Sequence, residues 1–266
     1  MMQRILANNP SLMTGLGTNT YLLGTGAHKI VIDPGPNDRA HCNAIIEHAG
    51  GVRSIKAILV THMHPDHSSN ANALSKQTGA PIYGGAPVND PYQDTSCQPT
   101  VQLTHKQTIN LPELSLTAVH TPGHVANHLC YWWPEQSVMF TGDHIMHGSS
   151  VVIIPPHGNM QHYLESLTLL THFPIMTLAP GHGELMHNPA DIINGLIEHR
   201  MTREQQILAS IQQPSTIDDL TSRIYQSLNP ALLPMAQHNV HAHLLKLESE
   251  NRAQQHQDFW QRVTPH

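Results

Sequence analysis

Charged side chains are scarce in this sequence. They make up 12% of the 266 residues, against roughly 25% in an ordinary soluble domain. The formal net charge is −6, and neither the first 198 residues nor the remainder has an excess of Lys and Arg. Proteins that bind nucleic acids usually concentrate basic side chains against the phosphates. The composition therefore favours a small-molecule substrate, although it leaves a nucleic-acid substrate possible.

Long apolar runs are missing as well. No run exceeds about five residues, whereas a membrane-spanning helix needs roughly 18 or more, so we expect no membrane helix. The first residues, MMQRILANNPSLM, lack the apolar core of a secretory signal. The three cysteines, Cys42, Cys97 and Cys130, form no C-x-x-C pair, which indicates free thiols in a reducing compartment. We therefore expect a cytoplasmic protein.

Two parts with different patterns follow one another along the chain. Residues 1–188 read as short apolar strands interleaved with helices, which predicts two sheets with helices outside them. From residue 189 onward the spacing of apolar residues is helical, so we predict domains at 1–188 and 189–266. The expected strands are 20–23, 29–33, 55–60, 114–119, 129–133, 138–140 and 175–178. The expected helices are 37–50, 70–78, 161–173, 190–211, 217–228 and 232–249.

Histidine is the residue in excess, with 23 copies. An isolated histidine pattern therefore carries little weight here. The segment T-H-M-H-P-D-H is different, because it directly follows the expected strand 55–60 and gathers four metal-binding side chains: His62, His64, Asp66 and His67. Imidazoles and carboxylates without cysteine suit Zn²⁺ and also accept Fe or Mn.

Three later segments each place a His or an Asp beside glycine after an expected strand. They are Thr121–His124, Thr141–Asp143 and Pro180–Gly183, the last of which contains His182. Glycine lets the chain turn sharply and lets the backbone come close to a ligand. The four segments together predict a metal site at one edge of the sheets.

In this order, the four segments resemble the motifs of the metallo-β-lactamase fold superfamily of metallohydrolases. The early Asp33–Pro34–Gly35 fits the same plan. The resemblance implies a four-layer αββα sandwich with a binuclear metal site between its loops. By position, it implies that one metal is bound by His62, His64 and His124, that the other is bound by Asp66, His67 and His182, and that Asp143 bridges both.

Two Zn²⁺ ions at such a site would lower the pKa of a shared water, so that a bridging hydroxide exists near neutral pH. Asp66 is expected to hold that hydroxide and to take its proton, while the cations stabilise charge on the substrate oxygen. The expected reaction is hydrolysis, and we favour a small acyl ester or thioester as the substrate. The loop residues His144, His157 and Tyr163 are candidates to line the substrate cleft.

Further segments resemble the group typified by β-lactamase-like protein 2. They are Pro155–Gly158, Tyr163–Leu167 and His199–Glu204. This similarity implies that the C-terminal helices form a small winged-helix-like domain. It also makes cleavage of single-stranded RNA the main alternative, because the animal representative of that group is regarded as an endoribonuclease. A persulfide dioxygenase with a single iron and a metal-binding sensor without turnover are further alternatives.

Overall fold

The structure is a computed structural model that describes residues 1–263 and contains two compact units. The first unit comprises Met1–Thr121, Asn127–Ser150 and Phe173–Pro189. The second comprises Pro122–Ala126, Val151–His172 and the chain from Ala190 onward. The division of the sequence into domains at 1–188 and 189–266 stays a prediction.

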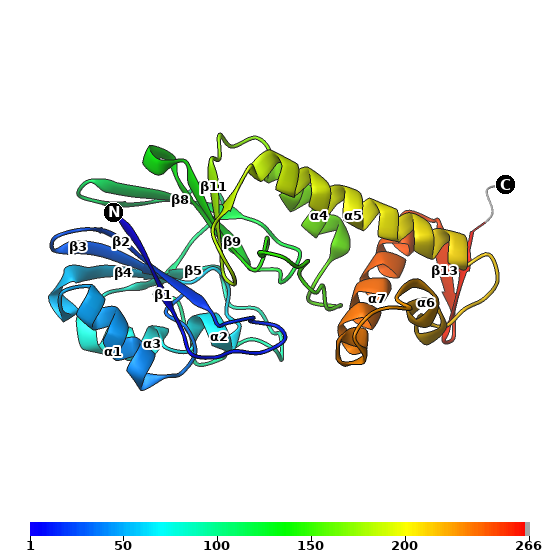
Figure 1. The fold of residues 1–266 in the computed structure, drawn as a ribbon, viewed down its shortest axis with the longest axis horizontal. Coiled ribbons are helices and arrows are strands. Elements are labelled where there is room, and N and C mark those ends of the chain that lie inside the picture. Colours follow the sequence, from blue (N-terminus) through cyan, green and yellow to red (C-terminus); the bar gives the residue numbers. More distant parts are fainter. Residues whose placement is uncertain (264–266) are drawn as a thin grey trace. The chain divides into compact units, whose positions relative to one another are not determined.

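Two six-stranded sheets form the layers of the first unit (Figure 1). The first sheet keeps chain order: β1 (Met2–Leu6), β2 (Asn19–Thr25), β3 (His28–Ile32), β4 (Ile55–Leu59), β5 (Ile82–Gly84) and β6 (Val101–Gln102). The second sheet has the order β12 (Met186–His187), β11 (Thr177–Pro180), β10 (Val138–Gly142), β9 (Leu129–Trp133), β8 (Leu114–His120) and β7 (Thr108–Leu111). Strands β3 to β6 are parallel, as are β10 and β11, and the other neighbours are antiparallel.

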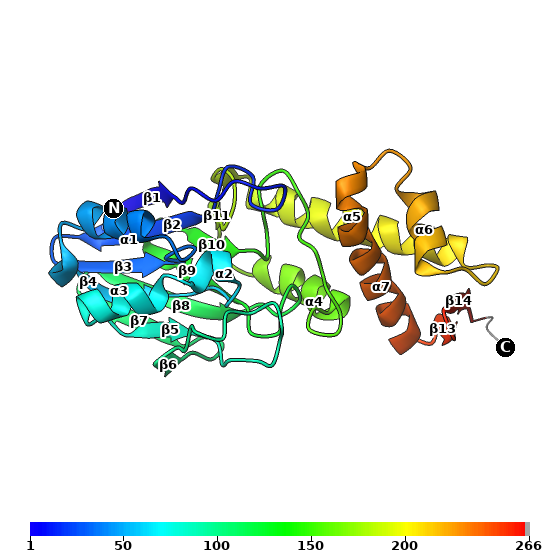
Figure 2. The ribbon, with the colours of Figure 1, turned by 90° about the horizontal axis from the view of Figure 1, so that it is seen from below.

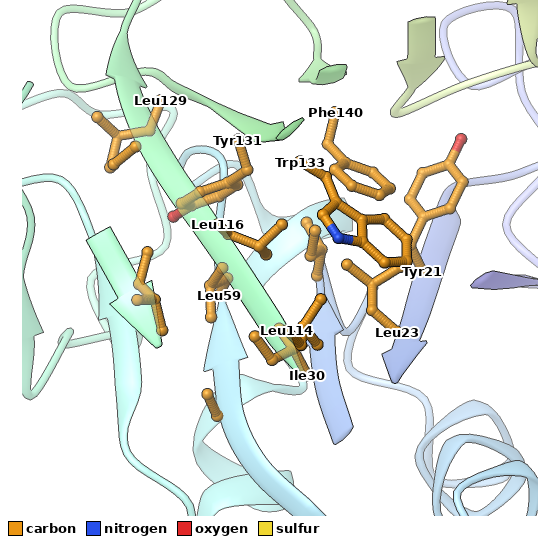
Figure 3. Close-up of a cluster of buried hydrophobic side chains, with 14 of the residues drawn as sticks. Tyr21, Leu23, Ile30, Leu59, Leu114, Leu116, Leu129, Tyr131, Trp133 and Phe140 are labelled. Carbon is orange, nitrogen blue, oxygen red and sulfur yellow. The ribbon is translucent and has the colours of Figure 1, made fainter. Parts of the chain in front are cut away.

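Apolar side chains from the two sheets meet in one buried cluster (Figure 3). Tyr21 of β2 packs against Phe140 of β10 edge to face, with ring centroids 5.1 Å apart. In β4, Ala57 and Leu59 belong to this cluster, while Ile58 belongs to a second cluster on the opposite face of the sheet. A strand that is buried on both faces needs apolar residues at almost every position, which explains the unbroken run at 57–60.

Helices cover the outer face of the first sheet. Helix α1 (Arg39–His48) contributes Cys42 and Ile45 to the second cluster, and α3 (Ala71–Thr78) contributes Leu74. Helix α3 ends at Gly79, whose φ of 72° is the left-handed conformation in which glycine is favoured. The short helix α2 (Pro65–Ser68) lies between them in sequence. The predicted strands and helices of this region are confirmed, with ends shifted by one or two residues.

The second unit is mainly helical. Its elements are α4 (Met160–Leu170), α5 (Pro189–Ser210), α6 (Ile217–Ile224), α7 (Leu233–Ser249), β13 (Ala253–His256) and β14 (Phe259–Arg262), visible in Figure 2. Leu220 of α6, Val240 and Leu244 of α7 and Trp260 of β14 share its apolar core. Helix α6 begins with a capping box, in which Thr216 and Asp219 satisfy each other's backbone N–H groups.

Several short elements had not been predicted. The hairpin β13–β14 lies beyond the last expected helix, and only Ala253 and Trp260 among its residues are buried. Strands β1, β5, β6, β7 and β12 were also missed. Strand β11 begins at Thr177, two residues later than expected. The 3-10 turns are Val52–Ser54, Pro134–Gln136 and Pro230–Leu232.

Two predictions from composition concern membrane-spanning helices and the state of the cysteines in residues 1–263. No helix in this part of the chain is long and apolar enough to cross a membrane. Cys42, Cys97 and Cys130 are all buried and none forms a disulfide, as predicted.

Candidate metal centre

The predicted ligands of the first unit all follow strands. Strand β4 leads into His62 and His64, and Pro65 then occupies the first position of α2, where a proline costs no hydrogen bond. Asp66 and His67 lie within this helix. Asp143 follows β10, and His182 follows β11. Because β10 and β11 are parallel neighbours, their following loops leave the sheet at the same edge.

Close approach of the backbone at this edge requires glycine. A Cβ atom on Gly181 would lie 2.6 Å from His67 Cε1 and 2.7 Å from Asp143 Oδ1. Gly142 has a φ of 46°, and a Cβ there would lie 2.5 Å from Thr61 Oγ1. The glycine beside His182 therefore makes room for two of the predicted ligands, and the glycine beside Asp143 makes room for Thr61.

The structure gathers the seven predicted ligands into two groups, within each of which the potential ligand atoms lie within 4.8 Å of one another. The first group is His62, His64, His124 and Asp143, and the second is Asp66, His67 and His182. Apart from the partly exposed His64 and Asp66, these residues are buried. The sequence motifs therefore meet in space as a cluster that is able to hold metal.

The second group has the dimensions of a metal site. His67 Nε2 and His182 Nε2 are 3.3 Å apart, and each lies 3.3 Å from Asp66 Oδ2. Asp143 Oδ1 lies 3.3 Å from His67 Nε2 and 3.4 Å from His182 Nε2. Ligand atoms about 2.0–2.1 Å from a tetrahedral Zn²⁺ are themselves roughly 3.3 Å apart. The donor atoms therefore have the spacing and the chemistry that a divalent cation requires.

Asp143 faces both groups. Its Oδ1 belongs to the set just described, and its Oδ2 lies 4.0 Å from His62 Nε2. In the first group, His62 Nε2 lies 3.0 Å from His64 Nδ1. The two oxygens of one carboxylate are thus directed towards different histidines, as a residue that bridges two cations would be.

Asp33 orients His67 and is the main residue of the centre to which the sequence had assigned no role. Its Oδ2 lies 2.9 Å from His67 Nδ1 and accepts a hydrogen bond from Thr61 Oγ1 at 2.8 Å, while its Oδ1 accepts one from the Thr61 backbone N–H at 2.7 Å. Asp33 adopts a φ of 50°, a conformation that few residues other than glycine tolerate. The only signal in the sequence was its position after a strand and before Pro34–Gly35.

Three of the other predicted ligands, His62, His124 and His182, are oriented in a similar way. The Nδ1 atom of His182 lies 3.2 Å from the Gly17 carbonyl oxygen, and that of His62 lies 3.1 Å from Thr61 Oγ1. The Nδ1 atom of His124 lies 2.8 Å from the Val152 carbonyl oxygen. An Nδ1–H that donates to such an acceptor leaves the lone pair on Nε2, the tautomer that can bind metal through Nε2.

The carboxylates of the centre raise the pKa values of two of its histidines. Burial alone would lower the pKa of His182, but Asp143 and Asp66 raise it to about 9. Burial likewise opposes protonation of His67, yet Asp66 and Asp143 raise its pKa well above the usual range. Protons bound to these histidines would neutralise the carboxylates. A divalent cation can supply the same charge, so its binding should release protons.

The candidates for the substrate cleft lie in different surroundings. His144 and Tyr163 are fully buried, and the Arg200 guanidinium lies 5.3 Å from the centre of the Tyr163 ring. His157 is partly exposed. A role for His144, His157 and Tyr163 in substrate binding stays a prediction.

Comparison with known families agrees with this fold. Residues 13–182 match the metallo-beta-lactamase superfamily, and residues 216–261 match the beta-lactamase associated winged helix domain. The chain belongs to the metallo-beta-lactamase superfamily. It has the α/β sandwich fold of that family, followed by a winged helix domain.

Among curated proteins, the chain is similar to the beta-lactamase-like protein 2 homolog of Drosophila melanogaster. The two are 33% identical over 265 residues, which cover 94% of this chain and 88% of the relative. It is also 34% identical to Thioesterase pkgB of Emericella nidulans over 209 residues, covering 77% of this chain and 57% of that protein.

A solved structure shares the fold over nearly the whole length. A metallo-beta-lactamase family protein from Thermus thermophilus superposes with a TM-score of 0.82 at 19% identity, with 98% of each chain covered.

Proposed function

We propose that this protein is a hydrolase that uses two divalent cations. His62, His64 and His124 would hold one cation, Asp66, His67 and His182 would hold the other, and Asp143 would bridge them. The observation that carries this proposal is that Nε2 of His67 and Nε2 of His182 lie 3.3–3.4 Å from each other and from a carboxylate oxygen of Asp66 and of Asp143. The donor set favours Zn²⁺, and Fe or Mn would accept the same ligands.

Asp66 is the residue to which we assign proton transfer. Its side chain is 27% exposed, and its Oδ2 accepts a hydrogen bond from Thr18 Oγ1 at 3.3 Å. Two bound cations would supply a water that ionises near neutral pH and a Lewis acid for the substrate oxygen. Asp66 Oδ1, which takes no part in the donor set, would accept the proton of the attacking water and return it to the leaving group.

An uncharged loop next to Asp66 that exposes two leucine side chains supports an acyl substrate. The loop Ala7–Thr18 contains no charged residue and ends at Thr18, which contacts Asp66. Its side chains Leu12 and Leu16 are 68% and 77% exposed. Leu16 lies two residues before Thr18, so their Cα atoms are at most about 7.6 Å apart. An acyl chain whose carbonyl lies beside Asp66 can therefore reach exposed leucine side chains.

Hydrogen bonds hold this loop in shape. Thr14 Oγ1 donates to the Asn9 carbonyl at 2.6 Å, and the Thr18 backbone N–H donates to Asn9 Oδ1 at 2.9 Å. A preorganised apolar surface binds an acyl chain at a lower entropic cost than a flexible one. RNA would meet neither a cation nor a stacking side chain on this loop. A small acyl ester or thioester is accordingly the substrate class that we propose, and the relative named as a thioesterase agrees with it.

The test combines metal analysis with a substrate panel. The purified chain, loaded with Zn²⁺, Fe²⁺ or Mn²⁺ in turn, is assayed for metal content and for cleavage of acyl thioesters, lactones and a labelled single-stranded RNA. We expect two metals per chain and chelator-sensitive hydrolysis of the thioester or the ester. Metal-dependent RNA cleavage without ester hydrolysis would overturn the substrate assignment. A stoichiometry of one iron with oxygen consumption would overturn hydrolysis itself.

A further inference from the structure

His124 lies in the segment Pro122–Ala126, which belongs to the second unit. Helix α4 and the residue before it hold this segment: the Asn159 backbone N–H donates to the Gly123 carbonyl, and Ser166 Oγ donates to the Pro122 carbonyl, both at 2.8 Å. Gly123 has a φ of 150°, and a Cβ there would lie 2.5 Å from the Cα of Tyr163. The backbone on the N-terminal side of His124 is therefore closely packed and fixed.

The orientation of the His124 ring depends on one further backbone group. Its Nδ1–H donates to the Val152 carbonyl oxygen at 2.8 Å. A hydrogen bond of this kind sets both the tautomer and the rotation of a metal-binding imidazole, and its loss commonly weakens metal affinity. The position of the Val152 peptide group is therefore important for the metal site.

The C-terminal helices hold the two residues that flank Val152. Arg200 of α5 donates through a terminal guanidinium nitrogen to the Val151 carbonyl oxygen. Asn239 of α7 accepts a hydrogen bond through Oδ1 from the Ile153 backbone N–H at 2.9 Å. The backbone is thus held on both sides of the carbonyl that accepts from His124.

Arg200 is a charged residue on the buried face of α5. It is 1% exposed, and its guanidinium lies 5.3 Å from the centre of the Tyr163 ring. Burying a charged guanidinium costs desolvation free energy, which hydrogen bonds to the group must offset. Arg200 belongs to the segment His199–Glu204, which resembles the β-lactamase-like protein 2 group and to which the proposed catalytic centre gives no role.

We propose that Arg200 and Asn239 are positioning residues for His124, so that the C-terminal helices set the metal affinity of the catalytic centre. This inference rests on the proposed function, because it takes His124 to be a metal ligand. In this arrangement α5 and α7 hold the backbone group that orients the His124 ring. A change in the packing of α5 or α7 would be transmitted through Val152 to His124.

Arg200→Met tests the proposal, because methionine keeps an unbranched side chain but removes every hydrogen-bond donor. The matched control is Arg203→Met in the next turn of α5, where the guanidinium packs on Tyr225 at 4.1 Å. Zinc affinities are measured by competition with a chromophoric chelator, and the Co²⁺-substituted protein is examined by absorption spectroscopy. We expect Arg200→Met to weaken one of the two metal sites by roughly 10- to 100-fold and to change its Co²⁺ spectrum. Arg203→Met should leave both sites unchanged.

A second pair of variants covers the case in which Arg200→Met does not fold. Asn239→Ala removes the acceptor for the Ile153 N–H, whereas Asn239→Asp keeps an oxygen there, so only the alanine variant should weaken the site. If the folded Arg200→Met or Asn239→Ala chain binds both metals within threefold of the wild type, the positioning role is wrong while the proposed function stands. If the wild-type chain binds fewer than two metals, the proposed function fails and this inference fails with it.

Discussion

Replacing Asp33 by Asn is the most specific perturbation of the centre that leaves all proposed ligands in place. Asn is among the residues that tolerate a positive φ, so the backbone at φ 50° should persist. The amide has one acceptor oxygen where the carboxylate has two. If that oxygen still accepts from the Thr61 backbone N–H, an NH₂ group faces His67 Nδ1, whose proton then has no acceptor.

The expected loss of metal affinity follows from these two opposed N–H groups. To avoid two opposed N–H groups, His67 would move its proton to Nε2, the atom that lies 3.3 Å from Asp66 Oδ2 and from Asp143 Oδ1. A protonated Nε2 cannot bind metal. Loss of an outer partner of a metal-binding histidine typically costs 10- to 100-fold in affinity, which is about 1.4–2.8 kcal/mol. We therefore expect one metal site of Asp33→Asn to weaken by that factor.

Chelator competition with Zn²⁺ measures this loss directly. Asp38→Asn is the matched control, because Asp38 caps α1 through a bond to the Ala40 N–H, and Asn caps a helix equally well. The control should bind both metals normally. If folded Asp33→Asn binds both metals within threefold of the wild-type affinity, the orienting role of Asp33 is refuted.

Three further predictions concern the mechanism, the substrate and the second unit. Asp66→Ala should abolish turnover and lower occupancy of one metal site, and wild-type-like turnover would exclude Asp66 as the proton acceptor. Leu16→Asp should raise KM about tenfold for an octanoyl thioester and little for an acetyl thioester, because only the longer chain loses a leucine contact. The control Met176→Asp, at a 68% exposed site, should change neither KM. Equal effects of Leu16→Asp on both substrates would argue against an acyl-binding loop. Burial would raise the pKa of Glu204, but His243 and Lys246 lower it to about 2 from its usual 4.5. The carboxylate should therefore stabilise the fold above pH 4.5 and lose that effect as pH falls towards 2, so the difference in unfolding free energy between wild type and Glu204→Gln should shrink over this range. A difference that stays constant with pH would contradict this prediction.

The sequence was sufficient to predict the candidate metal ligands, but it did not predict the residues that orient them. His62, His64, Asp66 and His67 could be predicted because they lie close together after a strongly apolar strand. Asp143 and His182 could be joined to them because each follows an expected strand beside glycine, and because the order of these segments resembles that of the metallo-β-lactamase superfamily.

The contacts of Asp33 and Thr18 could not be predicted, because both depend on pairings between distant segments. Thr18 meets Asp66 only after the loop before β2 has folded against α2. The hairpin β13–β14 was missed for a different reason: its one large buried side chain, Trp260, gives no alternating pattern. Besides the packing of Trp260 in the apolar core, the backbone groups of Ser215 and Trp260 exchange two hydrogen bonds, which the sequence does not indicate.

The distribution of ligands over the two sheets has a mechanical consequence. His62 to His67 extend from the first sheet, whereas Asp143 and His182 extend from the second. A bound cation would therefore act as a crosslink at the open edge of the sandwich, and its binding energy would add to the energy needed to separate the sheets there. Amide hydrogens at the ends of β4, β10 and β11 that lie next to the ligands should therefore exchange more slowly in the metal-loaded chain than in the metal-free chain.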